Sequence, residues 1–174
     1  MPIRQLKIII LITLSAGLLL VLSFFYYQKH AWQHFVRDHQ VIKISLKKHF
    51  FAPAQEKLVV EVVKSQPAIA QGLAGRSDLL TAQGQKIDGL LFVYPQASQL
   101  TFWMKEMQFP IDICWFNQAE LISCERNASI PDENQAPETL SLYHSPTPAN
   151  LVLETKPGKI THFSLAKLFF NSLY

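Results

Sequence analysis

The chain begins with one long apolar segment and continues as short apolar stretches separated by polar turns. Residues 8–26 carry no charge. A helix of this length can cross the roughly 30 Å hydrocarbon core of a bilayer. Arg4 and Lys7 precede the segment and aromatic residues gather at its far end, where amphipathic rings favour the headgroup layer. We therefore expect a cytoplasmic segment at residues 1–7 and a transmembrane signal anchor at residues 8–27.

A cleaved signal peptide is the alternative interpretation of this segment. Such peptides have a shorter apolar stretch of about 7 to 15 residues and then a cleavage site with small residues. Here bulky aromatics and the polar residues 28–30 follow instead, which favours an uncleaved anchor. The positive-inside rule places the N-terminus in the cytoplasm. The sequence thus predicts a single-pass membrane protein with a periplasmic or otherwise extracytoplasmic soluble domain.

Residues 28–48 are expected to form a juxtamembrane helix followed by a linker. Trp32, Phe35 and Val36 recur at helical spacing among polar residues, as in a helix that lies along a membrane surface. The nearby histidines raise the question of a metal site: His30, His34 and His39. Because no carboxylate or cysteine nearby completes a ligand set, we interpret them as a polar helix face and predict no metal.

The remaining residues, 49–174, form one domain whose pattern is dominated by short strands. We expect strands at residues 58–63, 89–94, 100–104, 111–116, 121–125 and 151–154, with hairpins joining the third strand to the second and the fifth to the fourth. Ser65 is placed to cap a short helix that ends at Gly72. Residues 159–174 fit either a short helix or a closing strand. The prediction is a β-dominated α+β fold: a compact, antiparallel, partly closed sheet or barrel with one or two short helices.

Charge and motifs exclude several function classes. The net charge of +3 comes from the N-terminal segment, since residues 39–174 contain twelve Lys and Arg against twelve Asp and Glu. A neutral domain lacks the basic surface that nucleic-acid binding requires. Gly-rich phosphate-binding loops are also absent, so we expect neither a nucleic-acid partner nor a cofactor.

Several segments, taken in order, resemble the prokaryotic family known as domain of unknown function 192. Residues 71–76 (Gln-Gly-Leu-Ala-Gly-Arg) are similar to its Arg-Gly-Leu-Met-x-Arg turn, and residues 89–92 to its Gly-Met-Leu-Phe strand. Residues 102–105 (Phe-Trp-Met-Lys) with 110–112 (Pro-Ile-Asp) resemble its Phe-Trp-Met-Lys-Asn and Pro-Leu-Asp blocks. Residues 143–158 resemble the closing block. Two departures stand out: Glu106 replaces the family's Asn, and the Gly-Asp before the last strand is not evident.

The resemblance implies a compact, β-rich, often exported or membrane-anchored domain, but no activity. We expect the polar residues of these blocks to converge around Trp103 and to bind a small polar ligand or an envelope protein. The candidate ligand-binding residues are Arg76, Trp103, Lys105, Asp112, Tyr143 and Glu154. In the alternative interpretation these residues only stabilise the fold, with Asp112 capping a turn and Lys105 pairing with Asp112 or Glu154.

An unrecognised hydrolase acting on an envelope substrate is the alternative from another class. It would use Ser145 or Ser141 with His144 and an acid such as Asp112 or Glu154. The chain has no Gly-x-Ser-x-Gly elbow, and adjacency of His144 and Ser145 in sequence does not bring base and nucleophile together. We therefore favour a non-enzymatic module without catalytic residues.

Cys114 and Cys124 are the only cysteines, and both fall within the second predicted hairpin. A two-residue turn at Gln118 and Ala119 pairs Cys114 with Ser123 and directs the two thiols to opposite faces. A shift of one residue places Cys114 opposite Cys124, where an oxidising compartment could bridge them. A disulfide and two buried free cysteines therefore both remain open.

Overall fold

The structure is a computed structural model that describes residues 13–23, 36–47, 53, 56–132, 135–160 and 167–172. The chain divides into two compact units, Met1–Phe35 and Val36–Tyr174. In the first unit, residues 13–23 are helical and carry exposed leucines. Within the described part of the chain, no helix has both the length and the apolar character needed to span a membrane. The rest of the expected anchor and the first part, residues 28–35, of the helix and linker expected at residues 28–48 lie outside the described residues, so the anchor stays a prediction.

The end of the expected linker belongs to the sheet. We assigned residues 28–48 to a helix and linker, but strand β1 spans Val41–Lys47 and pairs with β2, Glu56–Val63. The apolar residues Ile42, Ile44 and Leu46 occupy alternate positions of β1 and are buried, and Ser45 between them is buried as well. This period-two alternation is typical of a strand with one face in the core. The helical spacing of the residues upstream does not continue into residues 41–47.

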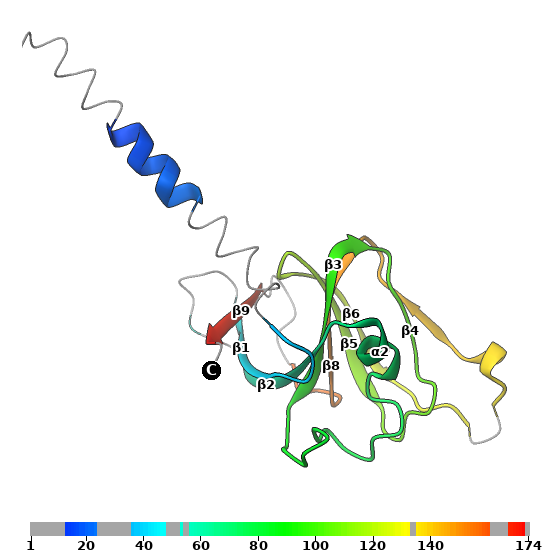
Figure 1. Cartoon of the computed structure of the whole chain (residues 1–174). Helices are drawn as coiled ribbons and strands as arrows, with labels where there is room; N and C mark the ends of the chain where they lie inside the picture. Colours follow the sequence, from blue (N-terminus) through cyan, green and yellow to red (C-terminus); the bar gives the residue numbers. More distant parts are fainter. Residues whose placement is uncertain are drawn as a thin grey trace, which may run out of the picture. The chain divides into compact units, whose positions relative to one another are not determined.

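Nine strands and two short helices make up the described part of the second unit. The further elements are α2 (Gln66–Gln71), β3 (Gly89–Ser98), β4 (Thr101–Trp103), β5 (Ile111–Asn117), β6 (Glu120–Ala128), the 3-10 helix η1 (Pro137–Thr139), β7 (Leu142–His144), β8 (Ala149–Thr155) and β9 (Lys167–Ser172). The main sheet has the strand order β1-β2-β3-β8-β5-β6-β9 and is strongly curved (Figure 1). β9 also pairs with β1, whereas it meets β6 through a single residue pair, Glu120 with Lys167.

The predicted fold class is therefore confirmed as a β-dominated α+β fold with a mostly antiparallel sheet. The one parallel pair within the described sheet is β2 with β3. The connection between them contains α2, as parallel strands require a crossover. Ser65 Oγ accepts from Ala68 N–H at the start of α2, and Gly72 with φ +49° ends it, as the sequence predicted. The C-terminal segment that fitted either a helix or a strand contributes strand β9.

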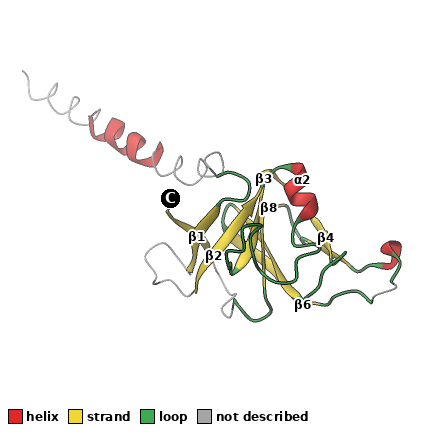
Figure 2. Cartoon of the chain, turned by 60° about the horizontal axis from the view of Figure 1, so that its bottom comes forward, coloured by secondary structure: helices red, strands yellow, loops and turns green. Residues whose placement is uncertain are grey.

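The first half of β3 buries both of its faces. On β3, Leu91 and Val93 alternate with Leu90 and Phe92, and all four are nearly inaccessible. Leu90 and Phe92 belong to a core that also contains Ala68 of α2. In Figures 1 and 2, α2 and β4 lie on the same side of the sheet (Figure 2). The two faces consequently offer two separate environments for polar side chains.

The predicted hairpin of the strands at residues 89–94 and 100–104 is wrong. β3 continues past Pro95 to Ser98, and β4 pairs with β7 in a separate two-stranded sheet, which we call the β4–β7 ribbon. Pro95 falls in a stretch of β3 where the pairing with β8 is interrupted, between Val93 and Ser98. Proline has no N–H to donate and is tolerated at such an irregularity. From the local sequence, Pro95 was expected to end the strand. The interruption in the pairing with β8, which allows β3 to continue past Pro95, depends on a distant strand and is not visible in the local sequence.

The β5–β6 hairpin forms as predicted, and it contains both registers that the sequence left open. Gln118 and Ala119 make a two-residue turn with φ of +48° and +71°. The first pairs follow that turn, but the register shifts by one residue between Trp115 and Phe116. Beyond this bulge Cys114 lies opposite Cys124, and the two form a disulfide. The bulge thus allows a tight turn and the bridge to coexist.

Candidate functional site

The predicted ligand-binding residues do not form a single cluster around Trp103. The turn of Arg76 adjoins that of Lys105, because Gly75 N–H donates to the carbonyl of Glu106. The side chains nevertheless have different partners, since Arg76 binds Glu61 whereas Lys105 lies over the ring of Trp103. Asp112 points to the other face of β5 from Ile113, the neighbour of Glu154. Asp112 and Glu154 therefore lie on opposite faces of the sheet, although the order of the motifs along the chain had suggested a common site.

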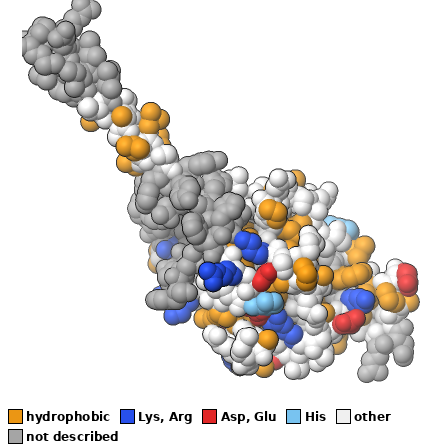
Figure 3. All heavy atoms as spheres, in the orientation of Figure 1, with side chains coloured by type: hydrophobic (Ala, Val, Ile, Leu, Met, Phe, Trp, Pro, Cys, Tyr) orange, Lys and Arg blue, Asp and Glu red, His pale blue; other side chains and the backbone are white. Residues whose placement is uncertain are grey.

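Trp103 lies on the outward face of the β4–β7 ribbon. It is 52% exposed and pairs directly with Leu142, which is 53% exposed. Lys105 Nζ lies 5.7 Å from the centre of the Trp103 ring, a cation–π distance. At the other end of the ribbon, Thr101 Oγ1 lies 3.0 Å from His144 Nδ1. Figure 3 shows hydrophobic side chains gathered over the β4 region beside side chains of both charges (Figure 3).

The inward face of the ribbon packs against the core and so holds the exposed pair of Trp103 and Leu142 in place. Phe102 pairs with Tyr143, and both pack against the core on the α2 side of the sheet. The rings of Phe102 and Phe92 make an edge-to-face contact with centroids 5.1 Å apart. Tyr143, one of the predicted binding residues, therefore mainly packs between the ribbon and the core.

A shallow groove of about 40 Å³ runs beside the ribbon. Its lining residues come from the ribbon and from the segment between β6 and β7: Met104, Ser129, Ile130, Pro131, Gln135, Leu140, Ser141 and Tyr143. Pockets for small organic ligands commonly enclose about 300 to 1,000 Å³. This groove is the size of a few atoms, which suits one anchoring side chain better than a whole ligand.

A second group of polar residues lies on the α2 side of the main sheet. Glu61 is 1% exposed in the middle of β2 and receives Arg76 through both guanidinium nitrogens, at 2.6 and 3.2 Å. His39 Nδ1 lies 2.7 Å from Glu61 Oε1. Burial alone would raise the pKa of Glu61, but the hydrogen bonds from Arg76 and His39 outweigh it and lower the pKa.

Glu154 lies in the same layer without a partner of its own. Glu61 pairs across the sheet with Leu90, and Leu90 pairs with Glu154, so the two carboxyl groups flank Leu90. Glu154 is 5% exposed, and its Oε2 has no hydrogen-bond partner. Burial raises the pKa of Glu154 to about 8, although the charge of Arg76 acts in the opposite direction. Burial, with a smaller contribution from Glu154, also raises the pKa of Tyr94 to about 12.

Sequence reasoning missed Glu61 and assigned His39 to the membrane surface. A glutamate in the middle of the apolar strand Leu-Val-Val-Glu-Val-Val was the available signal, because a strand buried on both faces accepts a charge only with a partner. The partner, Arg76, is fifteen residues away in sequence. Among the residues that the structure describes, no group of three or more His, Cys, Asp or Glu could hold a metal ion. His30 and His34 lie outside that part of the chain.

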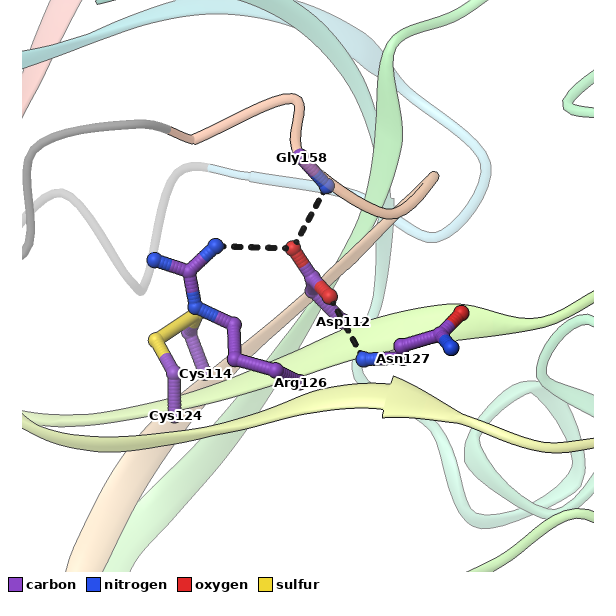
Figure 4. Close-up of a disulfide and its surroundings, with 6 residues drawn as sticks. All are labelled: Asp112, Cys114, Cys124, Arg126, Asn127 and Gly158. Carbon is purple, nitrogen blue, oxygen red and sulfur yellow. Dashed lines mark hydrogen bonds and ion pairs between the residues drawn. A yellow bond between two sulfur atoms is a disulfide. The ribbon is translucent and has the colours of Figure 1, made fainter.

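Asp112 has a structural position at one end of the β5–β6 hairpin (Figure 4). Its side chain is almost fully buried and accepts from Asn127 N–H at 2.8 Å and from Gly158 N–H at 3.0 Å. Arg126 approaches to 3.5 Å, and the Cys114–Cys124 disulfide lies alongside. Asp112 thus links β5, β6 and the turn after β8. It caps backbone groups, as the structural interpretation proposed, but its partner is Arg126 and not Lys105.

Ser145 and His144, the adjacent residues of the hydrolase hypothesis, do not meet as nucleophile and base. Ser145 is fully buried, and its Oγ accepts from Leu100 N–H at 2.9 Å. His144 lies on the outside of the ribbon, with its Nδ1 next to Thr101. A general base must reach the proton that it removes. In this arrangement Ser145 holds the ribbon to its connecting loop.

Comparison with known families decides the classification of the chain. The family model for DUF192, described as an uncharacterised ACR, matches residues 50–167, well over half of the 174 residues. The chain belongs to the DUF192 family. No curated protein matches it.

Two solved structures share the fold of this DUF192 domain. One is a protein from Sinorhizobium meliloti 1021 that is named as a candidate transcription regulator, with 20% identity and a TM-score of 0.60 over 79% of this chain and 99% of that one. The other is a protein of unknown function from Novosphingobium aromaticivorans DSM 12444, with 18% identity and a TM-score of 0.58 over 74% and 84%. At these identities the likeness concerns the fold alone.

One departure from the DUF192 pattern has a conformational explanation. Glu106, in place of the family's Asn, has φ of +58° and is exposed. Asparagine adopts this left-handed conformation more readily than other residues with a side chain. The backbone at this position therefore accounts for a preference for Asn without any contact to a ligand.

Proposed function

We propose that this DUF192 protein is a membrane-anchored, extracytoplasmic module that binds a partner protein through the outward face of the β4–β7 ribbon. The observation that carries this proposal is the exposed pair of Trp103 and Leu142 on a ribbon whose other face is packed into the core. Rigid, exposed aromatic side chains are typical of the residues that dominate the binding energy of protein interfaces.

The shape of the surface favours a protein over a small molecule as the partner. The adjoining groove of about 40 Å³ can receive one side chain. Ser145 N–H donates to the carbonyl of Leu100, so in the antiparallel pattern Trp103 and Leu142 form a non-hydrogen-bonded pair. Their backbone groups then point to the two outer edges of the ribbon. Such edges can accept a strand from a partner.

Charge around the ribbon indicates the chemistry of that partner. Three exposed acidic residues are close in sequence to the ribbon or to residues that line the groove: Glu106, Asp132 and Glu138. Lys105, which lies over the Trp103 ring, is also 3.7 Å from Glu106. A partner segment with an apolar anchor flanked by Lys or Arg would complement this surface.

Two features support the membrane-anchored, extracytoplasmic part of the proposal. The uncharged residues 8–26 have the length of a membrane span. The Cys114–Cys124 disulfide favours an oxidising compartment, because cytosolic thiols are generally kept reduced. Together they favour a domain held on the outer side of the membrane.

Photo-crosslinking of the full chain in cells tests the partner-binding proposal. A photoreactive phenylalanine at position 142 should give a discrete protein adduct, and the additional change Trp103→Ala should abolish it. The matched control is the same reporter at Gln83, which is exposed in the loop between α2 and β3. Adducts of equal strength at Gln83, or none at position 142 in a folded, disulfide-bonded protein, would argue against the proposal.

A further inference from the structure

The buried carboxyl groups on the α2 side are too many for their counter-charges. Glu61 and Glu154 flank Leu90 in neighbouring strands, and Arg76 is the cation that interacts with both. Its guanidinium group makes two hydrogen bonds to Glu61 and one to the carbonyl of Leu80. Because Arg76 is committed to Glu61, Glu154 has no hydrogen-bonded cation of its own.

A carboxyl group in this situation retains its proton. Moving an ionised carboxylate away from water without a partner costs more free energy than protonation does. Glu154 is buried and its Oε2 has no partner, so the neutral acid is the form that fits the site. The pKa of about 8 agrees with this conclusion.

His39 is the outer member of the group. Its side chain is 55% exposed, while Nδ1 lies 2.7 Å from the buried Glu61. The residue has φ of +60°, a conformation that is uncommon for histidine and places the ring against Glu61. Histidine changes charge close to neutral pH, so Glu61 gains a second cationic partner when His39 takes up a proton.

The remaining charged groups nearby do not replace any of these four. Asp38 interacts with His39 electrostatically, but its oxygens accept from the backbone N–H groups of Lys64 and Ser65. Tyr94 interacts with Glu154 from β3. Helix α2, with the sequence Gln-Pro-Ala-Ile-Ala-Gln, contributes no ionisable side chain.

We propose that His39, Glu61, Arg76 and Glu154 form one proton-binding site, in which protonation of His39 frees Arg76 from Glu61 to pair with Glu154. The ligand is a proton from solvent, taken up at the imidazole. With Arg76 beside it, Glu154 releases its own proton, so the net charge of the group is unchanged. Proton uptake at the surface is thereby coupled to proton release from the interior.

The position of the site gives this exchange a structural consequence. His39 belongs to the segment that leads from the first unit of the chain into β1. That segment is joined to β2 by His39 N–H to the carbonyl of Val62, and by Val62 N–H to the carbonyl of Gln40. The acidity of the surrounding medium therefore acts where the domain joins the segment that precedes it.

The test is a carboxyl-carbon NMR titration of the full chain in detergent micelles, labelled at the glutamate side chains. Glu154→Gln assigns the Glu154 signal. His39→Lys supplies a permanent cation beside Glu61, and His39→Gln supplies a neutral control of similar length. We expect the titration midpoint of Glu154 to be lower in His39→Lys than in His39→Gln by about one pH unit or more, the usual effect of a nearby opposite charge. Equal midpoints in the two variants would overturn the proposal.

A second measurement needs no variant at His39 and holds if His39→Lys does not fold. In the unmodified chain, the Glu154 carboxyl signal and the Arg76 side-chain nitrogen signals should both move with the midpoint of the His39 imidazole. If both stay constant while His39 titrates, Arg76 does not exchange and the four residues are only a static ion-pair network.

Discussion

Asp112 and Glu154 are two buried carboxyl groups on neighbouring strands, yet their surroundings have opposite character. Asp112 receives two backbone N–H groups and an arginine, and it faces the side of the sheet that carries the disulfide. Glu154 faces the α2 side with one oxygen unpartnered. The contrast teaches that burial of a charged residue within a family motif does not mark a function. Whether its hydrogen bonds are satisfied is the better guide.

The largest expected effect comes from replacing each acid by its amide. Asp112→Asn should lower the free energy of unfolding by about 3 kcal/mol, because an amide nitrogen would face the donors that now bind a carboxylate. Glu154→Gln should change it by less than about 1 kcal/mol, because the acid it replaces is already neutral. Urea unfolding of the two variants at pH 7 measures both. Similar losses in the two variants would remove the distinction.

An effect of intermediate size is expected in the pH dependence of the free energy of unfolding. The pKa of Glu154 in the folded protein, about 8, exceeds its ordinary value of 4.5. Between these values the folded state holds a proton that the unfolded state releases, so stability falls as pH rises from about 5 to 8, by at most about 1.4 kcal/mol per pH unit.

Unfolding free energies at pH 5.5, 6.5 and 7.5 measure this slope. Glu154→Gln should flatten it, whereas the lowered pKa of Glu61 acts at more acidic pH. A wild-type slope that Glu154→Gln leaves unchanged would show that Glu154 is ionised in the folded protein.

The smallest expected effect lies outside both carboxyl sites. Glu106→Asn should stabilise the protein by about 0.5 to 1 kcal/mol, because asparagine tolerates the left-handed backbone better. Glu106→Ala is the matched control, since it also removes the charge near Lys105 without that tolerance. A thermal melt compares them. If Asn and Ala behave alike, the conformation does not explain the family's Asn.

Local patterns predicted those elements whose determinants are close in sequence. The strand at residues 58–63, the cap at Ser65 and the hairpin around Gln118 and Ala119 depend on alternation, a side-chain hydrogen bond and turn length, and all three form. The β3–β4 hairpin was wrong because the partner of β4 is β7, about forty residues later. The sequence also offered no means to foresee the bulge that aligns Cys114 with Cys124.

The candidate site was predicted in its parts but not in its assembly. The sequence identified Arg76, Trp103, Asp112 and Glu154 as residues of interest, and each lies in a distinct structural position. It could not assign their neighbours, because one residue of difference along a strand moves a side chain to the opposite face.

The sequence by itself determined the class of this protein: an N-terminal apolar segment, a β-dominated domain and the motif blocks of the DUF192 family. These follow from hydrophobic periodicity and local chemistry, which act over a few residues. Only the tertiary structure decided that Arg76 pairs with Glu61, that Glu154 is left without a partner, and that Trp103 and Leu142 are exposed side by side. Such relations depend on strand order and register, which are set by packing between distant segments of the chain.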